Sequence, residues 1–173
     1  GLIATAAALP ALAFVGTADL GTVDIDPLAA FHQNANRTLS PDTLYTLHGL
    51  YYVQPGATLT IPAGTVIEGV PAATLVVKPG ATILANGTWD KPIVFTSNQA
   101  PGSRLPGDWG GVVILGRARV NQANPIIEGG IIAEGTYGGT DDTDNSGVFK
   151  YVRIEFAGYR FALNNEINGL TLG

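Results

Sequence analysis

Short runs of alternating apolar and polar residues, bounded by glycine, alanine or proline, dominate the middle of the chain. From His48 to Phe95 the sequence divides into six octads, which read HGLYYVQP, GATLTIPA, GTVIEGVP, AATLVVKP, GATILANG and TWDKPIVF. Glycine, alanine and proline at the joints between octads signal turns, whereas alternation over about five residues indicates a half-buried strand. The pattern therefore predicts short strands separated by tight corners.

One segment of the chain repeats after 24 residues. Val53–Leu59 (VQPGATL) returns as Val77–Ile83 (VKPGATI), and a fixed period of this size is typical of stacked repeat architectures. Three octads make one period, so that each turn contains three strands and three corners. The sequence thus predicts an all-β, right-handed parallel β-helix (a solenoid), in which each strand pairs with its equivalent in the next turn.

Alternation also assigns the two faces of the predicted strands. In the second octad Ala57, Leu59 and Ile61 are expected to point into the solenoid, while Thr58 and Thr60 point outwards. One turn later the equivalent inward positions are held by Ala81, Ile83 and Ala85, and Tyr51 and Val53 are expected to stack on Leu75 and Val77.

The third side of the turn departs from the period. Thr65–Ile67 matches Ile93–Phe95 only if four additional residues are inserted between them. The inserted segment carries Trp89, Asp90 and Lys91. We expect an insertion at this corner of the solenoid.

Beyond Thr96 loops interrupt the strands. Residues 97–108 (SNQAPGSRLPGD) predict a polar loop, and Gly110–Gly111 is expected to permit a close approach beneath it. Further strands are predicted at 109–115, 125–134, 148–156 and from 164 onwards. The last pattern breaks off at Gly173, and an uncovered strand edge invites pairing. We therefore expect either a partner at that end or, preferably, a longer chain of which residues 43–173 are the N-terminal part.

The first 42 residues differ from the rest. Residues 1–16 are apolar and uncharged, which suits either the remnant of a secretory signal or, preferably, an ordered segment that caps the solenoid. Residues 17–42 are more polar and are expected to form a linker and cap, with a short helix near Leu28–Phe31. We divide the chain into a leader and cap (1–42) and a β-helix (43–173).

Composition narrows the class of partner. Charged residues make up 13% of the chain and the net charge is −5, so the sequence lacks the basic footprint of a nucleic-acid-binding protein. It contains no cysteine, which excludes disulfides, thiolate catalysis and cysteine-based zinc sites. These properties fit an exported protein that needs no disulfides.

Three runs of the chain resemble a known family. PGATLTIPAGTVIEG (55–69), PGDWGGVVILGRA (106–118) and YGGTDDTDNSGVFKYVRIEFAG (137–158) are similar to a family of secreted or cell-surface bacterial parallel β-helix proteins. Its members are mostly uncharacterised, and many come from Bacteroidetes-like and related bacteria. The resemblance covers about residues 43–173 and implies an extracellular or outer-cell-surface location. It implies no settled activity and no catalytic residues.

The densest acidic cluster lies at residues 141–147. Asp142, Asp144 and Ser146, followed by a glycine, match the opening of a calcium-binding loop with oxygen ligands at alternate positions. However, Arg153 stands where an EF-hand needs a bidentate glutamate, and a strand follows instead of a helix. The two interpretations are a structural calcium ion and, preferably, a solvated acidic turn. No other cofactor is expected.

Aromatic side chains suggest a contact surface for glycans. Trp89, which lies in the insertion, is the best exposed candidate, whereas Trp109 beside two glycines is expected to pack under a loop. Tyr137, Tyr151 and Tyr159 are further candidates, and local packing is the alternative for each of them.

An outward threonine strip suggests an ice-binding surface as a third possibility. It would consist of Thr58, Thr60, Thr74 and Thr82. Leu84 replaces Thr60 one turn later, and threonine is also an ordinary exposed strand residue. The strip is therefore short.

The sequence assembles no catalytic residue set. His32 and His48 have no nucleophile motif nearby, and Lys150 and Arg153 are expected to point to opposite faces of one strand. We expect a non-catalytic structural or adhesive protein that associates with itself, as in a filament, or with another surface protein through its uncapped C-terminal turn. A polysaccharide-binding or polysaccharide-cleaving enzyme fragment is the alternative, and an ice-binding surface is the second alternative.

Overall fold

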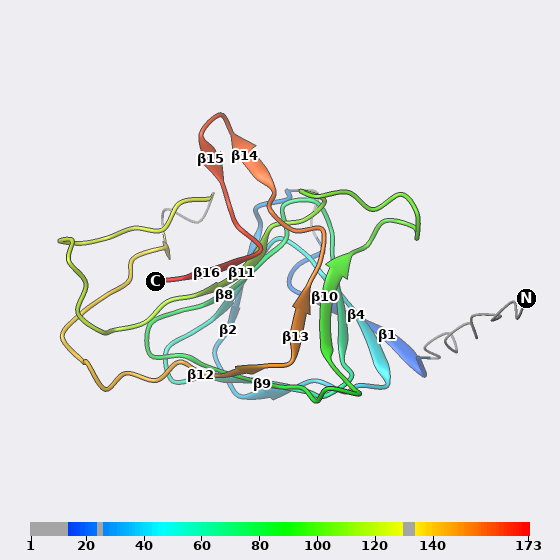
Figure 1. The fold of residues 1–173 in the computed structure, drawn as a ribbon, viewed down its shortest axis with the longest axis horizontal. Coiled ribbons are helices and arrows are strands. Elements are labelled where there is room, and N and C mark those ends of the chain that lie inside the picture. The colour runs from blue at the N-terminus through cyan, green and yellow to red at the C-terminus, as the bar shows by residue number, and fades with distance from the viewer. Residues whose placement is uncertain (1–13, 24–25, 130–133) are drawn as a thin grey trace, which may run out of the picture.

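The computed structural model describes residues 14–23, 26–129 and 134–173. Within these residues the chain forms β-strands and no α-helix. The strands follow one another around a coil, and Figure 1 looks roughly along the direction in which its turns are stacked. The prediction of an all-β parallel β-helix is confirmed.

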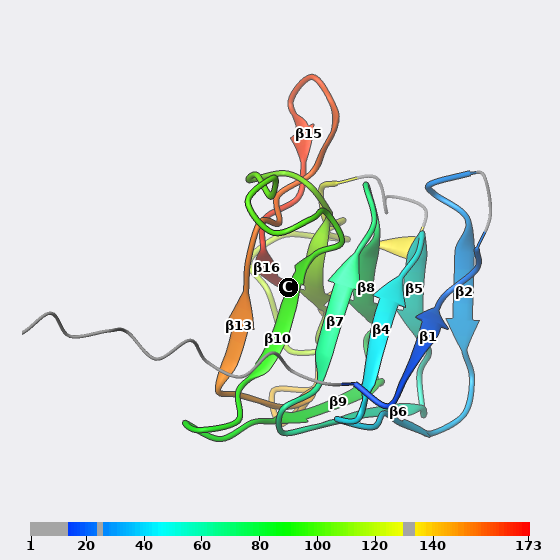
Figure 2. The same ribbon diagram turned by 90° about the vertical axis from the view of Figure 1, so that its right-hand side faces the viewer.

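Three parallel sheets form the sides of the coil. Sheet A, seen side by side in Figure 2, contains β1 (Gly16–Leu20), β4 (Thr43–Leu47), β7 (Val66–Gly69), β10 (Ile93–Ser97) and β13 (Val152–Ile154). Sheet B contains β2 (Ala30–Gln33), β5 (Leu50–Val53), β8 (Thr74–Val77), β11 (Gly111–Ile114) and β16 (Leu170–Leu172). Sheet C contains β3 (Arg37–Thr38), β6 (Thr58–Pro62), β9 (Thr82–Asn86) and β12 (Gly147–Lys150). Each turn takes one strand from sheets A, B and C in that order.

The 24-residue period sets the register of sheets B and C. Leu59 pairs with Ile83 and Tyr51 pairs with Leu75, as the repeat predicts. The predicted inward residues of β6 and its flank are buried, whereas Thr58 and Thr60 are partly exposed. In sheet A Val66 aligns with Val94, 28 residues later, which confirms the four-residue insertion.

The stack begins before the position that the sequence assigned to it. β1, β2 and β3 pair in parallel with β4, β5 and β6, so that much of the predicted cap forms a turn of the coil. The short helix predicted near Leu28–Phe31 is wrong, because Ala30–Gln33 pairs with Leu50–Val53 and Phe31 stacks on Tyr51 with ring centroids 5.1 Å apart. The predictions for residues 1–16 fall mainly on 1–13, which lie outside the described residues.

Trp109 occupies the interior of the coil. Its side chain is fully buried and stacks on Phe95, with a centroid separation of 6.2 Å. Its indole Nε1 donates a hydrogen bond of 2.8 Å to the backbone oxygen of Glu155. A Cβ atom at Gly69 would lie 2.8 Å from the indole, so this glycine makes room for the ring. The expectation that Trp109 is packed rather than exposed is confirmed.

Gly110 and Gly111 permit close contact between successive turns. A Cβ atom at Gly110 would lie 2.1 Å from Thr74 Oγ1, and one at Gly111 would lie 2.3 Å from the backbone oxygen of Asn168. The close approach predicted from the sequence therefore exists, but it joins this strand to its neighbouring turns and not to the 97–108 loop.

The three central strands of sheet B are buried on both faces, whereas its outer strands β2 and β16 are largely exposed. β5, β8 and β11 consist of consecutive buried residues, which is the pattern of a strand covered on both sides. Their outward side chains pack beneath described residues of the long segment 115–146, between β11 and β12, and beneath residues in or next to β14 (Arg160–Ala162) and β15 (Asn165–Glu166). This second apolar cluster contains Leu50, Tyr52, Val76, Val113, Leu115 and Ile167, with Ile127, Tyr137 and Phe161 packed against it.

Residues 125–129 and 134, the described part of the strand predicted at 125–134, form no strand. Within the described residues of the long segment the strand-like pairing is one isolated antiparallel bridge between Ile126 and Thr136. Leu115, Ile127 and Tyr137 of this segment instead pack on the outer face of sheet B. The predictions at 148–156 and after 164 are confirmed by β12, β13 and β16.

Candidate functional site

Two exposed aromatic residues lie at the corner between sheets C and A. Trp89, between β9 and β10, is 83% exposed, and Tyr151, between β12 and β13, is 51% exposed. Lys91 and Lys150 flank them in the sequence. We refer to Trp89, Lys91, Lys150 and Tyr151 as the aromatic corner.

A tight turn holds Trp89 in place. The backbone N–H of Thr88 donates to the oxygen of Lys91 (3.1 Å), and the N–H of Lys91 donates back to Thr88 Oγ1 (3.2 Å). The N–H of Gly64 in the preceding turn also donates to the oxygen of Lys91 (3.1 Å). These bonds fix the backbone on both sides of Trp89, so that the exposed indole stands on an ordered support.

Tyr151 lies at the same corner in the following turn. The N–H of Gly87 donates to the oxygen of Lys150 (2.9 Å), and the N–H of Ile93 donates to the oxygen of Tyr151 (3.0 Å). A Cβ atom at Gly87 would lie 2.6 Å from the Tyr151 oxygen, so glycine is needed for this contact. Since adjacent turns are stacked about 4.8 Å apart, the two aromatic residues occupy neighbouring levels of one edge.

The aromatic corner carries lysines that are not bound to carboxylates. Of the three lysines in the chain, all of them in described parts, Lys78 forms an ion pair, whereas Lys91 and Lys150 form none. Lys150 Nζ lies 5.4 Å from the centroid of the Tyr151 ring, within the range of a cation–π interaction. Asp90 adds one negative charge to the same turn. The corner therefore offers stacking surfaces together with cationic donors.

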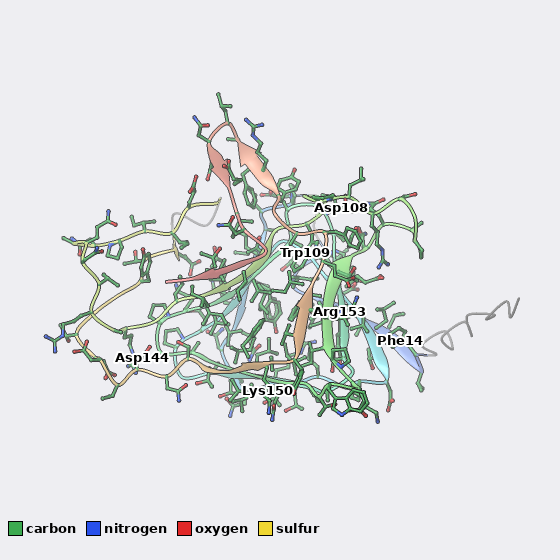
Figure 3. All side chains as sticks on the ribbon, viewed as in Figure 1. Phe14, Asp108, Trp109, Asp144, Lys150 and Arg153 are labelled. Carbon is green, nitrogen blue, oxygen red and sulfur yellow. The ribbon has the colours of Figure 1, made fainter. Side chains whose placement is uncertain are left out.

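Lys150 and Arg153 lie on different sides of the coil, as Figure 3 shows. The prediction that they share no face is therefore confirmed, but not through alternation along one strand, because Tyr151 adopts a left-handed conformation (φ 49°) and separates β12 from β13. Arg153 instead forms an ion pair with Glu155.

The remaining aromatic candidates are engaged in packing. Tyr137 packs against the second apolar cluster, and Tyr159 makes an edge-to-face contact with Phe161 at 5.1 Å. With Trp109 in the core, the structure brings Trp89 and Tyr151 together at one exposed corner and leaves the other three away from it.

The threonine strip is broken by the geometry of the sheets. Thr58 aligns with Thr82 on sheet C, but Thr60 aligns with Leu84, which in turn aligns with Val148. Thr74 belongs to sheet B and is fully buried. It aligns with Leu50 and lies on the same face of β8 as Val76, so it points outwards as expected, but residues that cover sheet B bury it and it forms no part of an exposed strip.

The acidic cluster lies beside two arginines of the β11–β12 segment. Asp142 pairs with Arg119 (2.6 Å) and Asp144 with Arg117 (2.9 Å). The backbone N–H of Arg117 also donates to Asp144 (2.9 Å) and holds the pKa of this carboxyl below its usual value, with further help from the guanidinium. The backbone oxygen of Ser146 accepts a hydrogen bond from the N–H of Ile83. Asp144 lies in the left-hand part of Figure 3.

Calcium is expected to have little effect on the stability of this segment. Because Arg117 and Arg119 already neutralise the carboxylates of Asp144 and Asp142, a bound ion would have to displace them. No group of three or more histidine, cysteine, aspartate or glutamate side chains within the described residues could hold a metal ion. We expect thermal unfolding followed by circular dichroism to give Tm values within about 1 °C in calcium and in a chelator. A rise of several degrees with calcium would instead establish an ion in this loop.

A second cluster of charged groups fastens the 115–146 segment to sheet B. The carboxylate of Glu134 lies 2.6 Å from Lys78 Nζ and 2.7 Å from His32 Nε2. The His32 ring stacks on Tyr52 at 5.2 Å. Burial raises the pKa of Tyr52 to about 12, and the charge of Glu134 adds to this effect. Although burial of Glu134 opposes its ionisation, Lys78 and His32 together lower the pKa of its carboxyl.

Replacing Glu134 with glutamine is expected to destabilise the protein by about 1 kcal/mol at neutral pH, since the ion pairs are partly exposed. A lowered pKa means that the carboxylate stabilises the fold above its ordinary pKa, and that this contribution is lost as the pH falls below that value. The difference in the free energy of unfolding between the wild type and Glu134→Gln should therefore be smaller at about pH 3.5 than at neutral pH. Urea unfolding at both pH values measures this difference. Glu128→Gln, in the same segment but without an ion pair, is the control and should show no such dependence.

His48 also forms a pair outside the aromatic corner. Its Nε2 lies 2.9 Å from Asp19 Oδ1, on the outer side of the first two turns. His32 and His48 thus each contact a carboxylate, but they lie at separate places on the coil.

Within the described residues no helix is long and apolar enough to cross a membrane.

Comparison with known proteins identifies the family. Residues 31–172 match the family described as the pectate-lyase-like β-helix domain. Neither the curated proteins nor the solved structures contain a match. The match covers most of the parallel coil, including the first-turn strand β2 and the aromatic corner. The chain therefore belongs to the family of pectate-lyase-like β-helix domains.

Proposed function

We propose that this chain is a non-catalytic adhesive β-helix domain, located outside the cell or on its surface, that holds a polysaccharide at the aromatic corner. The observation that carries the proposal is the pair Trp89 and Tyr151, exposed on adjacent turns and supported by backbone hydrogen bonds. The absence of cysteine and the low content of charged residues are compatible with export.

The shape of the corner favours a polymer over a small molecule. Small ligands bind in concave pockets that enclose most of their surface, whereas Trp89 stands at the tip of a turn on an outer edge. An extended chain can lie along an edge and contact aromatic rings at successive levels. Because hydrogen bonds already order the backbone around Trp89, little conformational entropy is lost there on binding.

The charges of the corner favour an acidic polysaccharide. Lys91 and Lys150 have no carboxylate partner within the described structure and can bind carboxylates of a polymer. Pectate, which the description of the family names, is a polymer of this kind. Attraction between exposed groups is screened by salt, so binding should weaken as the ionic strength rises.

Replacing Trp89 with alanine is expected to weaken binding of polygalacturonate about tenfold. A stacked ring contributes about 1–3 kcal/mol to binding in other polymer complexes, and 1.4 kcal/mol corresponds to a factor of ten. Tyr151→Ala should act in the same direction. Affinity electrophoresis and calorimetric titration against a panel of neutral and acidic polysaccharides measure the effect.

Two controls make this experiment decisive. Leu163→Ala removes another exposed apolar side chain (77% exposed) at a distant loop and should leave binding unchanged, while Trp89→Phe should retain most of the affinity. If no polysaccharide of the panel binds, or if Trp89→Ala binds as well as the wild type, the aromatic corner is not a glycan site.

A polysaccharide-cleaving enzyme is the second candidate, and the description of the family supports it. Cleavage requires an acid or base next to the bound chain. Asp90 is the carboxylate within the turn that carries Trp89. We expect neither unsaturated products nor new reducing ends when the polymer is incubated with the protein. Product formation that is lost in Asp90→Asn would replace the adhesive proposal by an enzymatic one.

A further inference from the structure

The chain contains two Asn-Gly pairs, Asn86–Gly87 and Asn168–Gly169, in different surroundings. An asparagine loses its side-chain amide most readily when glycine follows it, because glycine has no side chain to hinder attack by its own backbone nitrogen. Both asparagines are exposed to solvent. Exposure therefore does not distinguish the two pairs, and the difference lies in the backbone that follows each asparagine.

The first pair is held between two neighbouring turns. Asn86 is the last residue of β9, which pairs with β6 on one side and with β12 on the other. The backbone N–H of Gly87 donates to the oxygen of Lys150 (2.9 Å), and Gly87 is buried. The Gly87 nitrogen is thus engaged, and it cannot attack the Asn86 side chain unless the coil opens locally.

The second pair lies outside the strands. Asn168 and Gly169 connect Ile167 to β16, and within the described residues the N–H of Gly169 forms no hydrogen bond. Asn168 also lines a recess of about 290 Å³ next to the outer side of sheet B, which gives water access to its side chain. The Gly169 nitrogen is thus available for reaction with the side chain beside it.

We propose that Asn168–Gly169 is a site of spontaneous deamidation, and that the stacked turns protect Asn86–Gly87 from the same reaction. The Gly169 nitrogen loses its proton and forms a bond to Cγ of Asn168, while the bond from Cγ to Nδ2 breaks and Nδ2 leaves as ammonia. Water then cleaves the cyclic imide at one or the other of its carbonyl carbons. Cleavage at Cγ gives aspartate, and cleavage at the backbone carbonyl gives isoaspartate. The net reaction is the hydrolysis of an amide and needs no reagent except water.

Isoaspartate at this position alters the contact between the last two strands of sheet B. The main chain then runs through the side-chain methylene of residue 168, which lengthens the backbone at that point. The Asn168 oxygen packs against Gly111, where a Cβ atom would lie 2.3 Å from it, and the Gly169 oxygen accepts a hydrogen bond of 2.9 Å from the N–H of Val112. We therefore expect the modification to weaken the pairing of β11 with β16.

The test is incubation of the intact chain in mildly alkaline buffer, followed by peptide mapping with tandem mass spectrometry. Each deamidation replaces an NH₂ group by OH, and fragment masses identify the residue. We expect Asn168 to react at least about tenfold faster than Asn86, because the hydrogen-bonded backbone after Asn86 must first open. The chain unfolded in guanidinium chloride is the reference, in which the two pairs should react at similar rates.

Hydrogen exchange tests the structural basis of the proposal separately. The N–H of Gly169 should exchange rapidly, whereas the N–H of Gly87 should be protected. Asn168→Gln is the matched variant, because it keeps the amide group but adds a methylene that disfavours ring closure. It should abolish the modification at residue 168 and leave the slow reaction of Asn86 unchanged.

Anion exchange separates the modified chain from the unmodified chain, and thermal unfolding compares them. We expect the isoaspartate form to have a Tm lower by about 2 °C or more. Asn168→Asp carries the same charge without the longer main chain and should unfold as the wild type does. An isoaspartate form as stable as the wild type would contradict the weakened pairing of β11 with β16.

Two other results would overturn the site itself. These are a reaction at Asn168 that is no faster than at Asn86 in the folded chain, and protection of the Gly169 N–H equal to that of the Gly87 N–H. None of these measurements involves a polysaccharide, so that the proposal and glycan binding at the aromatic corner succeed or fail independently.

Discussion

Replacing Ile83 with aspartate is expected to unfold the β-helix. The Ile83 side chain is 1% exposed and stacks on Leu59 of the preceding turn. The substitution removes about 1.5–3 kcal/mol of apolar burial, and a buried carboxylate without a partner adds a penalty of several kcal/mol. The sum, about 5 kcal/mol or more, is comparable to the whole stability of an ordinary domain.

The neighbouring residue provides a matched control for this change. Leu84 lies on the same strand, β9, but points to the outer face of sheet C and is 37% exposed. Leu84→Asp introduces the same charge one residue further on, where water solvates it, and should lower the free energy of unfolding by no more than about 1 kcal/mol. Urea unfolding and the far-ultraviolet circular dichroism spectrum report both variants. Similar stabilities of the two variants would contradict the inward and outward assignment of this strand.

Truncation of Trp109 to alanine is expected to lower the free energy of unfolding by about 3–5 kcal/mol, the usual range for a large buried aromatic residue. The change removes the stacking contact with Phe95 and leaves a cavity against Gly69. It also removes the hydrogen bond to the backbone oxygen of Glu155. Several favourable contributions are therefore lost from one position of the core.

Trp89, the other tryptophan of the chain, provides the matched control for the truncation of Trp109. Trp89→Ala deletes the same side chain from a position that is 83% exposed and should change the free energy of unfolding by less than about 0.5 kcal/mol. Chemical denaturation monitored by tyrosine fluorescence or circular dichroism measures both variants. A large loss of stability in Trp89→Ala would show that the indole supports the turn, and would then also weaken its assignment to ligand binding.

The aromatic corner combines a rigid scaffold with a surface that contributes little to stability. The stacked strands supply the ladders that hold the interior, whereas Trp89 lies in residues that interrupt the 24-residue period. Its removal can therefore change binding while the fold persists. The opposite holds for Trp109, whose side chain fills the coil and contacts no solvent.

The candidate site could be predicted only in part from the sequence. Trp89 stood out because it lies in a four-residue insertion, which marks a protrusion from a regular repeat. Tyr151 was one of several aromatic candidates, because no feature of the sequence around it indicates that it lies beside the turn that carries Trp89. Its position next to the Gly87–Ile93 segment depends on the pairing of β9 with β12, strands that are separated by β10, β11 and two long loops.

Two predictions failed for the same physical reason. A short helix was expected near Leu28–Phe31, and a strand was expected at 125–134, of which residues 125–129 and 134 are described. In both places the preference of the local sequence is weak, and contacts with residues distant in the sequence decide the outcome. β2 becomes a strand because β5 offers it a complete set of backbone partners, whereas Ile127 and its neighbours pack on a sheet face that is already formed.

The sequence by itself determined the coil: its period fixed three strands per turn, and alternation fixed which residues of β6 and β9 fill the interior. These properties are readable because each depends on residues close together or one constant period apart. Only the tertiary structure decided where the stack begins, which sheet face the 115–146 segment covers, and which aromatic and acidic side chains lie together. Those outcomes depend on the pairing of turns across loops of unequal length, and no local pattern records the length of chain that a loop adds between two stacked strands.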